Sequence, residues 1–114
     1  MAAKRILVVE DEFLIALDIA GTLEQAGLAV IGPVANVGDA LNAIAREPID
    51  GALLDAHLAG EPAGRIADAL IARRIPFAFV SGYGREHLPA AHRNALLVKK
   101  PFTGKDLLAA VASF

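Results

Sequence analysis

Residues 49–55 read Ile49-Asp50-Gly51-Ala52-Leu53-Leu54-Asp55, an apolar run that ends in a carboxylate. A short, continuous apolar run of this kind is typical of a strand that is covered on both faces, as in a parallel sheet. A carboxylate at the end of such a strand lies at the carboxyl edge of the sheet, where open α/β folds hold their ligands. The run therefore predicts a buried strand with a functional group, Asp55, at its end.

Similar runs alternate with helical patterns along the whole chain. The other β-rich runs are Ile6–Val9, Leu28–Ile31, Phe77–Val80 and Leu96–Val98. Apolar residues with helical spacing lie between the runs: Phe13, Ala16, Leu17, Ala20 and Leu23, then residues 37–44, 66–70 and 107–111. This alternation predicts a doubly wound α/β fold with a parallel sheet covered on both faces.

Capping residues mark the expected helix ends. Gly27 is placed to end the first helix, Asn36 to cap the second and Thr103 to cap the last. Pro62 suits an early position in the third helix, where its missing N–H costs nothing. The helices are therefore expected to be short and well delimited.

The segment 83–94, between the fourth and fifth strands, lacks a good helical pattern. Gly82 and Gly84 open it, and Pro89 removes a helical hydrogen bond in its middle. We therefore expect a short or irregular fourth helix. We expect its two histidines, His87 and His92, to lie on the surface.

Composition limits the classes of function. With 114 residues, of which 55% are hydrophobic, the chain fits a single domain spanning 1–114. The net charge of -2 gives no basic excess for nucleic acid, and no apolar stretch approaches the roughly 20 residues that span a bilayer. The absence of Cys excludes disulfides and thiolate metal sites and suits a reducing compartment. We expect a cytoplasmic protein that binds another protein, and neither nucleic acid nor membrane.

Polar groups follow several of the predicted strands. Glu10 and Asp11 come after the first, Asp55 ends the third, Ser81 ends the fourth and Lys100 follows the fifth. These groups should share one edge of the sheet, where three carboxylates repel one another unless a cation lies between them. Ligands that offer only oxygen select a hard ion that keeps open positions, so Mg²⁺ is the expected metal.

A carboxylate beside a metal, a lysine and a hydroxyl is equipped for phosphoryl transfer. Asp55 would be the nucleophile, Lys100 would neutralise phosphoryl oxygens and Ser81 would donate a hydrogen bond. The product, an aspartyl phosphate, adds charge at the sheet edge and can act as a switch. We expect a phosphoacceptor with Mg²⁺-dependent autophosphorylation and autodephosphorylation, not a turnover enzyme.

The order of these motifs resembles that of response-regulator receiver domains, the phosphoacceptors of two-component signalling. The resemblance covers the whole chain and is carried by Ile6-Leu7-Val8-Val9-Glu10-Asp11-Glu12, Leu53-Leu54-Asp55, Val80-Ser81-Gly82 and Lys99-Lys100-Pro101-Phe102. It implies a flavodoxin-like (βα)5 sandwich with a five-stranded parallel sheet in the order 2-1-3-4-5. It also implies that Asp55 takes its phosphoryl group from a sensor histidine kinase or a histidine phosphotransfer protein. The implied Mg²⁺ ligands are Glu10, Asp11, Asp55 and the backbone carbonyl of His57, while Ser81 and Lys100 would contact the phosphoryl group.

A narrower resemblance concerns residues 76–84, which are similar to a receiver subgroup with a Phe-Ala-Thr-Gly-Tyr-like motif on strand four. Members of this subgroup are often stand-alone or linked to general stress signalling. The chain departs from the common receiver pattern at Glu10, which replaces Asp, and at Leu97, which replaces the usual switch aromatic. Tyr83 could report the switch instead. Ala59 stands where many receivers carry Pro, which predicts a looser loop.

The same residues also fit simpler structural roles and two different functions. The acidic run 10–12 could cap the following helix, Asp55 could cap a loop and Ser81 could belong to a turn. The protein could be a phosphorelay intermediate or phosphate sink without an output surface, or a flavodoxin-like module that binds a mononucleotide. If it is a switch, we expect the output face to comprise the fourth helix, fifth strand and fifth helix. The expected contributors to this face are Arg85, Leu88, Lys99, Lys105 and Asp106.

Overall fold

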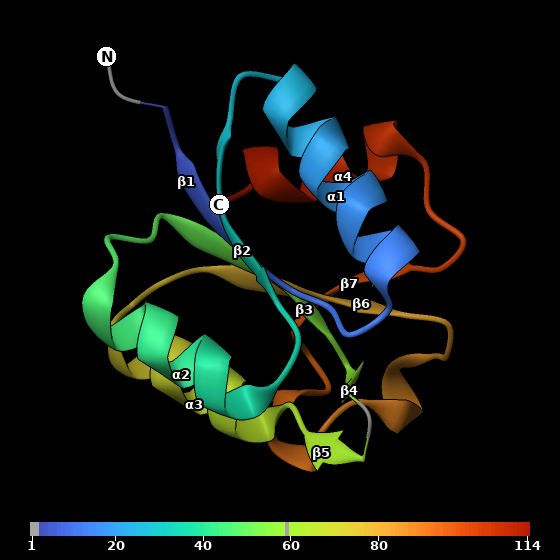
Figure 1. Cartoon of the computed structure of the whole chain (residues 1–114). Coiled ribbons are helices and arrows are strands. Elements are labelled where there is room, and N and C mark those ends of the chain that lie inside the picture. Colours follow the sequence, from blue (N-terminus) through green and yellow to red (C-terminus); the bar gives the residue numbers. More distant parts are fainter. Residues whose placement is uncertain (1–2, 59) are drawn as a thin grey trace.

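The five apolar runs form one parallel sheet in the computed structural model, which describes residues 3–58 and 60–114. Its strands are β1 (Arg5–Val9), β2 (Ala29–Val34), β3 (Gly51–Asp55), β6 (Phe77–Ser81) and β7 (Leu96–Lys99). They lie in the order β2-β1-β3-β6-β7, which is the predicted order 2-1-3-4-5 once the strands of this sheet are counted along the chain (Figure 1). The doubly wound flavodoxin-like fold is therefore confirmed.

Helices cover both faces of the sheet. Their bounds are α1 (Phe13–Gln25), α2 (Val37–Arg46), α3 (Gly64–Ala72) and α4 (Gly104–Ala112). Helices α1 and α4 lie on one face, and α2 and α3 lie on the other (Figure 1). Within residues 3–58 and 60–114, no helix has the length and apolar character needed to span a membrane.

The alternation of side chains along the inner strands divides the core into two layers. In β1, Ile6 and Val8 pack toward α1 and α4, while Leu7 and Val9 pack toward α2 and α3. Strand β3, at the centre of the sheet, is buried at every position, as its continuous apolar run predicts. The edge strands β2 and β7 keep partly exposed residues. The sheet is therefore a rigid platform whose carboxyl edge carries the polar residues.

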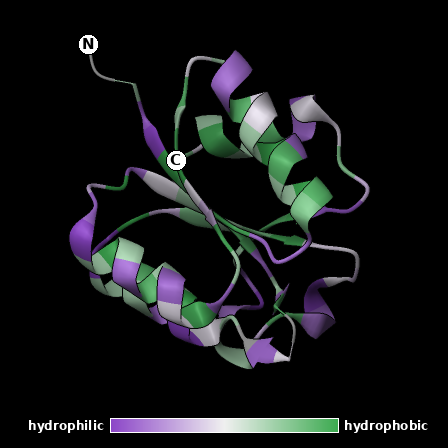
Figure 2. Ribbon diagram, in the orientation of Figure 1, coloured by the Kyte–Doolittle hydropathy of each residue, from purple (hydrophilic) through white to green (hydrophobic). Residues whose placement is uncertain are grey.

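The face of α1 differs from the predicted one. Phe13 and Leu17 were expected on its inner face, but they are 73% and 51% exposed. Leu14, beside them, is 77% exposed. The inner face instead carries Ala16, Ile19, Ala20 and Leu23. Residues 13–17, at the start of α1, are all apolar, and this end of the helix is green in Figure 2, so hydrophobic periodicity alone could not select the buried stripe.

Most predicted caps are confirmed. Gly27 ends α1 with a φ of 86°, and Asn36 accepts a hydrogen bond from the N–H of Asp39 at the start of α2. Thr103 forms a reciprocal capping box with Asp106 at the start of α4. These contacts fix the helix ends next to the strands that they follow.

The connection between β3 and α3 differs from expectation. Helix α3 begins at Gly64, so Pro62 precedes it and is not an early helical residue. Pro62 belongs to the short strand β5 (Glu61–Pro62), which pairs with β4 (His57–Leu58) in a hairpin that the sequence did not predict. Ala59, the position of the expected looser loop, lies outside the described residues.

The fourth helix is irregular, as predicted. It is replaced by two single 3₁₀ turns, η1 (Arg85–His87) and η2 (Ala90–His92). Two expectations for this segment are wrong, because Leu88 is only 3% exposed and His92 only 8%. In a segment without a helical repeat, the sequence does not indicate which side chains turn inward. Leu88 and His92 are the side chains that anchor this segment to the rest of the fold.

Candidate functional site

The residues predicted to carry the function gather at the carboxyl edge of the sheet. Glu10 directly follows β1, Asp55 ends β3, Ser81 ends β6 and Lys100 follows β7. Because the strands are parallel, these four positions meet at the same edge. Glu10, Asp55 and Ser81 are all buried, which is uncommon for polar side chains unless they have partners.

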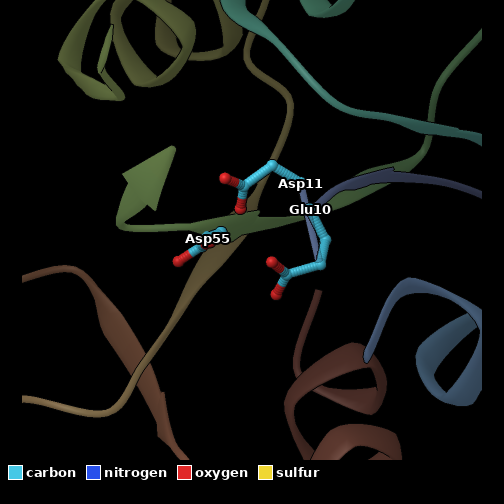
Figure 3. A group of neighbouring side chains, drawn as sticks. All are labelled: Glu10, Asp11 and Asp55. Carbon is cyan, nitrogen blue, oxygen red and sulfur yellow. The ribbon is translucent and has the colours of Figure 1, made fainter. Parts of the chain in front are cut away.

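Three carboxylates face one another at this edge. Oxygen atoms of Glu10, Asp11 and Asp55 lie within 4.8 Å of one another, and the three side chains turn toward a common space (Figure 3). Glu10 and Asp55 are buried, and Asp11 is partly exposed. The donor set offers only carboxylate oxygen, which suits a hard divalent cation such as Mg²⁺.

Asp55 is held in a form that resists ionisation. Burial is the main reason why the pKa of Asp55 rises from 3.8 to about 7, and the neighbouring Glu10 carboxylate adds to the rise. The backbone N–H of His57, which donates to Asp55 Oδ1 at 3.0 Å, and the charge of Lys100 act in the opposite direction. The raised pKa therefore reflects mainly the burial of the carboxyl group, and the repulsion from Glu10 is the part that a bound cation would relieve.

Lys100 lies closer to Glu10 than to Asp55. Its Nζ is 3.0 Å from Glu10 Oε1 and 3.8 Å from Asp55 Oδ1. Burial opposes its charge, but the hydrogen bond to Glu10 and the nearby carboxylates outweigh burial and raise the pKa of Lys100. The backbone N–H of Lys100 donates to the carbonyl of Ser81 at 2.7 Å, which ties the lysine to the end of β6. The preceding Lys99 is exposed to solvent.

Glu10 also organises the start of α1. Its Oε2 accepts a hydrogen bond from the N–H of Glu12 at 3.2 Å. Glu12 is the N-cap residue of α1, but its own side chain makes no capping hydrogen bond, and the first turn carries no acidic residue. Glu10 therefore contributes to the start of the helix, as considered for the acidic run, and it makes this contact while it also pairs with Lys100.

Ser81 and the exposed rings border the site. The Oγ of Ser81 accepts a hydrogen bond from the N–H of Tyr83 at 3.1 Å. The Tyr83 ring lies 5.2 Å from the ring of His57 and 4.8 Å from that of His87. The His57 side chain is exposed, so this residue meets the site through its backbone.

Sequence reasoning missed two features. One is the apolar surface formed by Phe13, Leu14 and Leu17 on the turns of α1 that follow the acidic pair. The other is a contact between His92 and Asp68 of α3, whose atoms Nε2 and Oδ1 are 2.9 Å apart. The run of apolar residues 13–17 could have indicated the apolar surface on α1. No spacing rule links positions 68 and 92, so the sequence could not indicate the contact between His92 and Asp68.

The fold and the edge site define a doubly wound α/β protein with an acidic, lysine-flanked centre, and solved structures with this architecture match the chain closely. No family model matches the sequence, and no curated protein sequence matches it. SdrG from Sphingomonas melonis Fr1 shares 37% identity at a TM-score of 0.86, with 99% of this chain and 97% of SdrG covered. A response regulator receiver protein from Sinorhizobium medicae WSM419 shares 27% identity at a TM-score of 0.81, with 97% and 93% covered.

A third match is a response regulator protein from Burkholderia pseudomallei, solved with a phosphorylated aspartic acid, a calcium ion and citrate. It shares 25% identity at a TM-score of 0.80, with 94% of this chain and 65% of that protein covered. The chain belongs to the response-regulator receiver family. Its assignment to the subgroup with the Phe-Ala-Thr-Gly-Tyr-like motif stays a prediction.

Proposed function

We propose that this protein is a stand-alone receiver, a single domain over 1–114, that accepts a phosphoryl group on Asp55 from a histidine kinase or a histidine phosphotransfer protein. The observation that carries the proposal is the meeting of Asp55 with an acidic pair and a lysine at one sheet edge. There Lys100 Nζ lies 3.0 Å from Glu10 and 3.8 Å from Asp55. A nucleophile, a cation site and a fixed positive charge are the parts that phosphoryl transfer requires.

The proposed Mg²⁺ ligands are the carboxylates of Glu10, Asp11 and Asp55 and the backbone carbonyl of His57. The mutual distances within 4.8 Å support a cation site at this point, and the Glu10 carboxylate, which contributes to the raised pKa of Asp55, adds repulsion that a cation would relieve. The extra methylene of Glu10 fits its contacts with both Lys100 and the start of α1. When bound, Mg²⁺ supplies positive charge beside the transferred phosphoryl group and favours ionised Asp55.

In the proposed transfer, an oxygen of ionised Asp55 attacks the phosphorus of a phosphohistidine. The O–P bond forms as the P–N bond breaks, and the imidazole nitrogen keeps the electron pair and takes up a proton. Lys100 would move from Glu10 toward a phosphoryl oxygen, a short shift from its position between the two carboxylates. The Ser81 hydroxyl can donate to another phosphoryl oxygen while it still accepts from Tyr83. Attack of water on phosphorus later releases inorganic phosphate and restores the carboxylate.

Intact mass after incubation with a small acyl phosphate and Mg²⁺ tests the proposal. The native chain should gain one phosphoryl group, and Asp55→Asn should gain none. Glu24→Gln, which removes an exposed acid from the far end of α1, is the control and should be modified like the native chain. A native chain that stays unmodified with the acyl phosphate and with a kinase would overturn the proposal.

We also propose that the phosphoryl donor docks on the apolar surface of Phe13, Leu14 and Leu17. A donor must bring its phosphohistidine to Asp55, and this surface begins two residues after Asp11. Neighbouring exposed apolar side chains such as these are typical of protein interaction sites. Leu14→Asp should slow transfer from a phosphorylated histidine kinase at least tenfold and leave acyl phosphate labelling unchanged.

The control for this variant is Ile71→Asp on α3, since Ile71 is also exposed, at 54%, but lies on the other face of the sheet. Equal kinase-dependent rates for Leu14→Asp and Ile71→Asp would exclude docking on α1.

The proposed output face comprises the segment 85–94, β7 and α4. Its exposed contributors are Arg85, Lys99, Lys105 and Asp106. We place the reaction in the cytoplasm.

A further inference from the structure

One buried polar residue of the described chain lies outside the candidate site. The buried polar side chains among residues 3–58 and 60–114 are Glu10, Asp55, Ser81 and His92, and the first three belong to the site. The His92 side chain is 7% exposed, and its Nε2 lies 2.9 Å from Oδ1 of Asp68. Because the Asp68 carboxylate can only accept, the bonded nitrogen of His92 carries the hydrogen. Burying an imidazole costs free energy unless such a partner is present.

Aromatic rings close around His92 on its other side. Its ring centroid is 6.3 Å from those of Phe77 and Phe79, and these two phenyl rings lie edge to face at 5.5 Å. Phe79 is fully buried in the core layer beneath α2 and α3. His92 therefore joins a solvent-exposed carboxylate on α3 to the inner face of the sheet.

The segment that carries His92 is mostly bonded to itself. The His92 N–H donates to the carbonyl of Pro89 at 2.8 Å, and the Ala95 N–H donates to the carbonyl of His92 at 3.0 Å. The guanidinium of Arg85 donates to the carbonyls of Arg93 and Ala95. Segments of this kind, with two single turns and few buried side chains, are the ones that open most easily. Leu88 and His92 are the buried anchors that hold it.

The same strand face links this anchor to the proposed phosphoryl site. Phe77, Phe79 and Ser81 occupy alternate positions of β6, so their side chains share one face of the strand. The rings of Phe77 and Phe79 are in contact, so a shift of β6 that starts at Ser81 would displace the two rings that hold His92. Close-packed rows change between discrete arrangements and do not deform smoothly.

We propose that the His92–Asp68 contact is a latch that holds residues 85–94 closed against α3, and that a phosphoryl group on Asp55 opens it through the Ser81–Phe79–Phe77 row. The second half of this proposal rests on the proposed phosphorylation of Asp55. The latch itself is independent of it, because the contact is present without a phosphoryl group.

Amide hydrogen exchange at His92 and Ala95 tests the latch in the full chain. Asp68→Ala is the main variant, because an Asn at this position would keep an amide oxygen that accepts the same hydrogen bond. The Asp68 side chain is 70% exposed, so its removal leaves the core intact. We expect exchange of both amides to become at least tenfold faster in Asp68→Ala, with β1 and α1 unchanged. Glu24→Ala, which removes an exposed carboxylate from α1, is the control and should exchange like the native chain. Native exchange rates in Asp68→Ala would overturn the latch.

The coupling is tested on the same samples after acyl phosphate and Mg²⁺, with intact mass recorded in parallel. Phosphorylated native chain should exchange these amides at least tenfold faster, and Asp68→Ala should show little further change. The nitrogen resonance of His92 Nε2 should also lose its hydrogen-bonded shift, which a merely structural residue would keep. A phosphorylated chain with unchanged exchange would overturn the coupling alone. A chain that never gains the phosphoryl group would overturn the proposed function and the coupling, while the unphosphorylated variants would still decide the latch.

Discussion

Asp55 is stabilised in its protonated form when no cation is bound, and this has a definite consequence for stability. Its pKa is about 7 in the folded chain and 3.8 ordinarily, so between these values the folded state binds a proton that the unfolded state has released. Stability therefore falls as pH rises through this window. The contribution is fully present below pH 3.8 and is lost above about pH 7.

Asp55→Asn removes this titration and should make the metal-free protein more stable than the native chain at pH 8, by up to about 4 kcal/mol. The difference should shrink toward pH 4 and should also shrink when Mg²⁺ is saturating. Urea unfolding across this pH range, in a chelator and then in Mg²⁺, measures it. Glu24→Gln removes an exposed carboxylate at the far end of α1 and should show no such pH dependence. A constant difference at all pH values would mean that burial and repulsion at Asp55 are unimportant.

At the same scale, the sequence predicted that the candidate site residues lie together, because strand ends have fixed places in a parallel sheet. The apolar runs locate Asp55, Glu10 and Lys100 at one edge without any knowledge of side-chain contacts. The sequence could not predict that Lys100 lies closer to Glu10 than to Asp55. The distances of 3.0 Å and 3.8 Å depend on rotamers and packing. The burial of His92 was not predicted either, because its partners Asp68 and Phe79 are remote in sequence.

Among the elements, the junction of β1 with β2 sets the position of Glu10. The register between these strands shifts between Leu7 and Val9, so that Val9 pairs with Val34. The carbonyl of Val34 then accepts the N–H of Glu10 at 2.9 Å. Gly32 makes this possible with a φ of 94°, a conformation that a residue with a Cβ adopts at a cost.

Gly32→Ala should destabilise the fold by about 2 kcal/mol or more, because the conformation is left-handed and the space is filled. A Cβ at this position would lie 2.7 Å from the Val34 nitrogen and 3.1 Å from the Val8 carbonyl oxygen. Gly21→Ala is the matched control: it lies inside α1 with nothing within 4 Å of its Cβ. It should stabilise the protein by roughly 0.5 to 1 kcal/mol. Thermal unfolding of both variants measures the contrast, and equal melting temperatures would refute the argument.

The elements also show where pattern reading succeeds and where it stops. The alternating buried runs predicted the sheet. Asn36 and Thr103 predicted the starts of α2 and α4, because a capping side chain bonds a backbone N–H within three residues of it. The inner face of α1 was misjudged, since residues 13–17 are all apolar and only packing against the sheet selects Ala16 and Ile19. The hairpin of β4 and β5 has two residues in each strand, too few for a periodic signal.

At the scale of the whole molecule, the repulsion among the carboxylates at the acidic edge should change the free energy of global unfolding. A small domain with a continuous core on each face of its sheet is expected to unfold as one unit, so binding at the edge stabilises everything. Mg²⁺ at about one hundred times its dissociation constant should add about 2.7 kcal/mol to the free energy of unfolding. The melting temperature should rise steadily with Mg²⁺ concentration.

Asp11→Asn should weaken this response, because it takes one of the three carboxylates out of the group that lies within 4.8 Å. The response is measured as the difference between the melting temperatures with and without Mg²⁺, so that a change in the stability of the metal-free variant does not enter it. Glu24→Gln, with the same change in net charge, should keep the native response to Mg²⁺. A native melting temperature that ignores Mg²⁺, or an Asp11→Asn variant that responds as the native chain does, would exclude the acidic edge as the metal site.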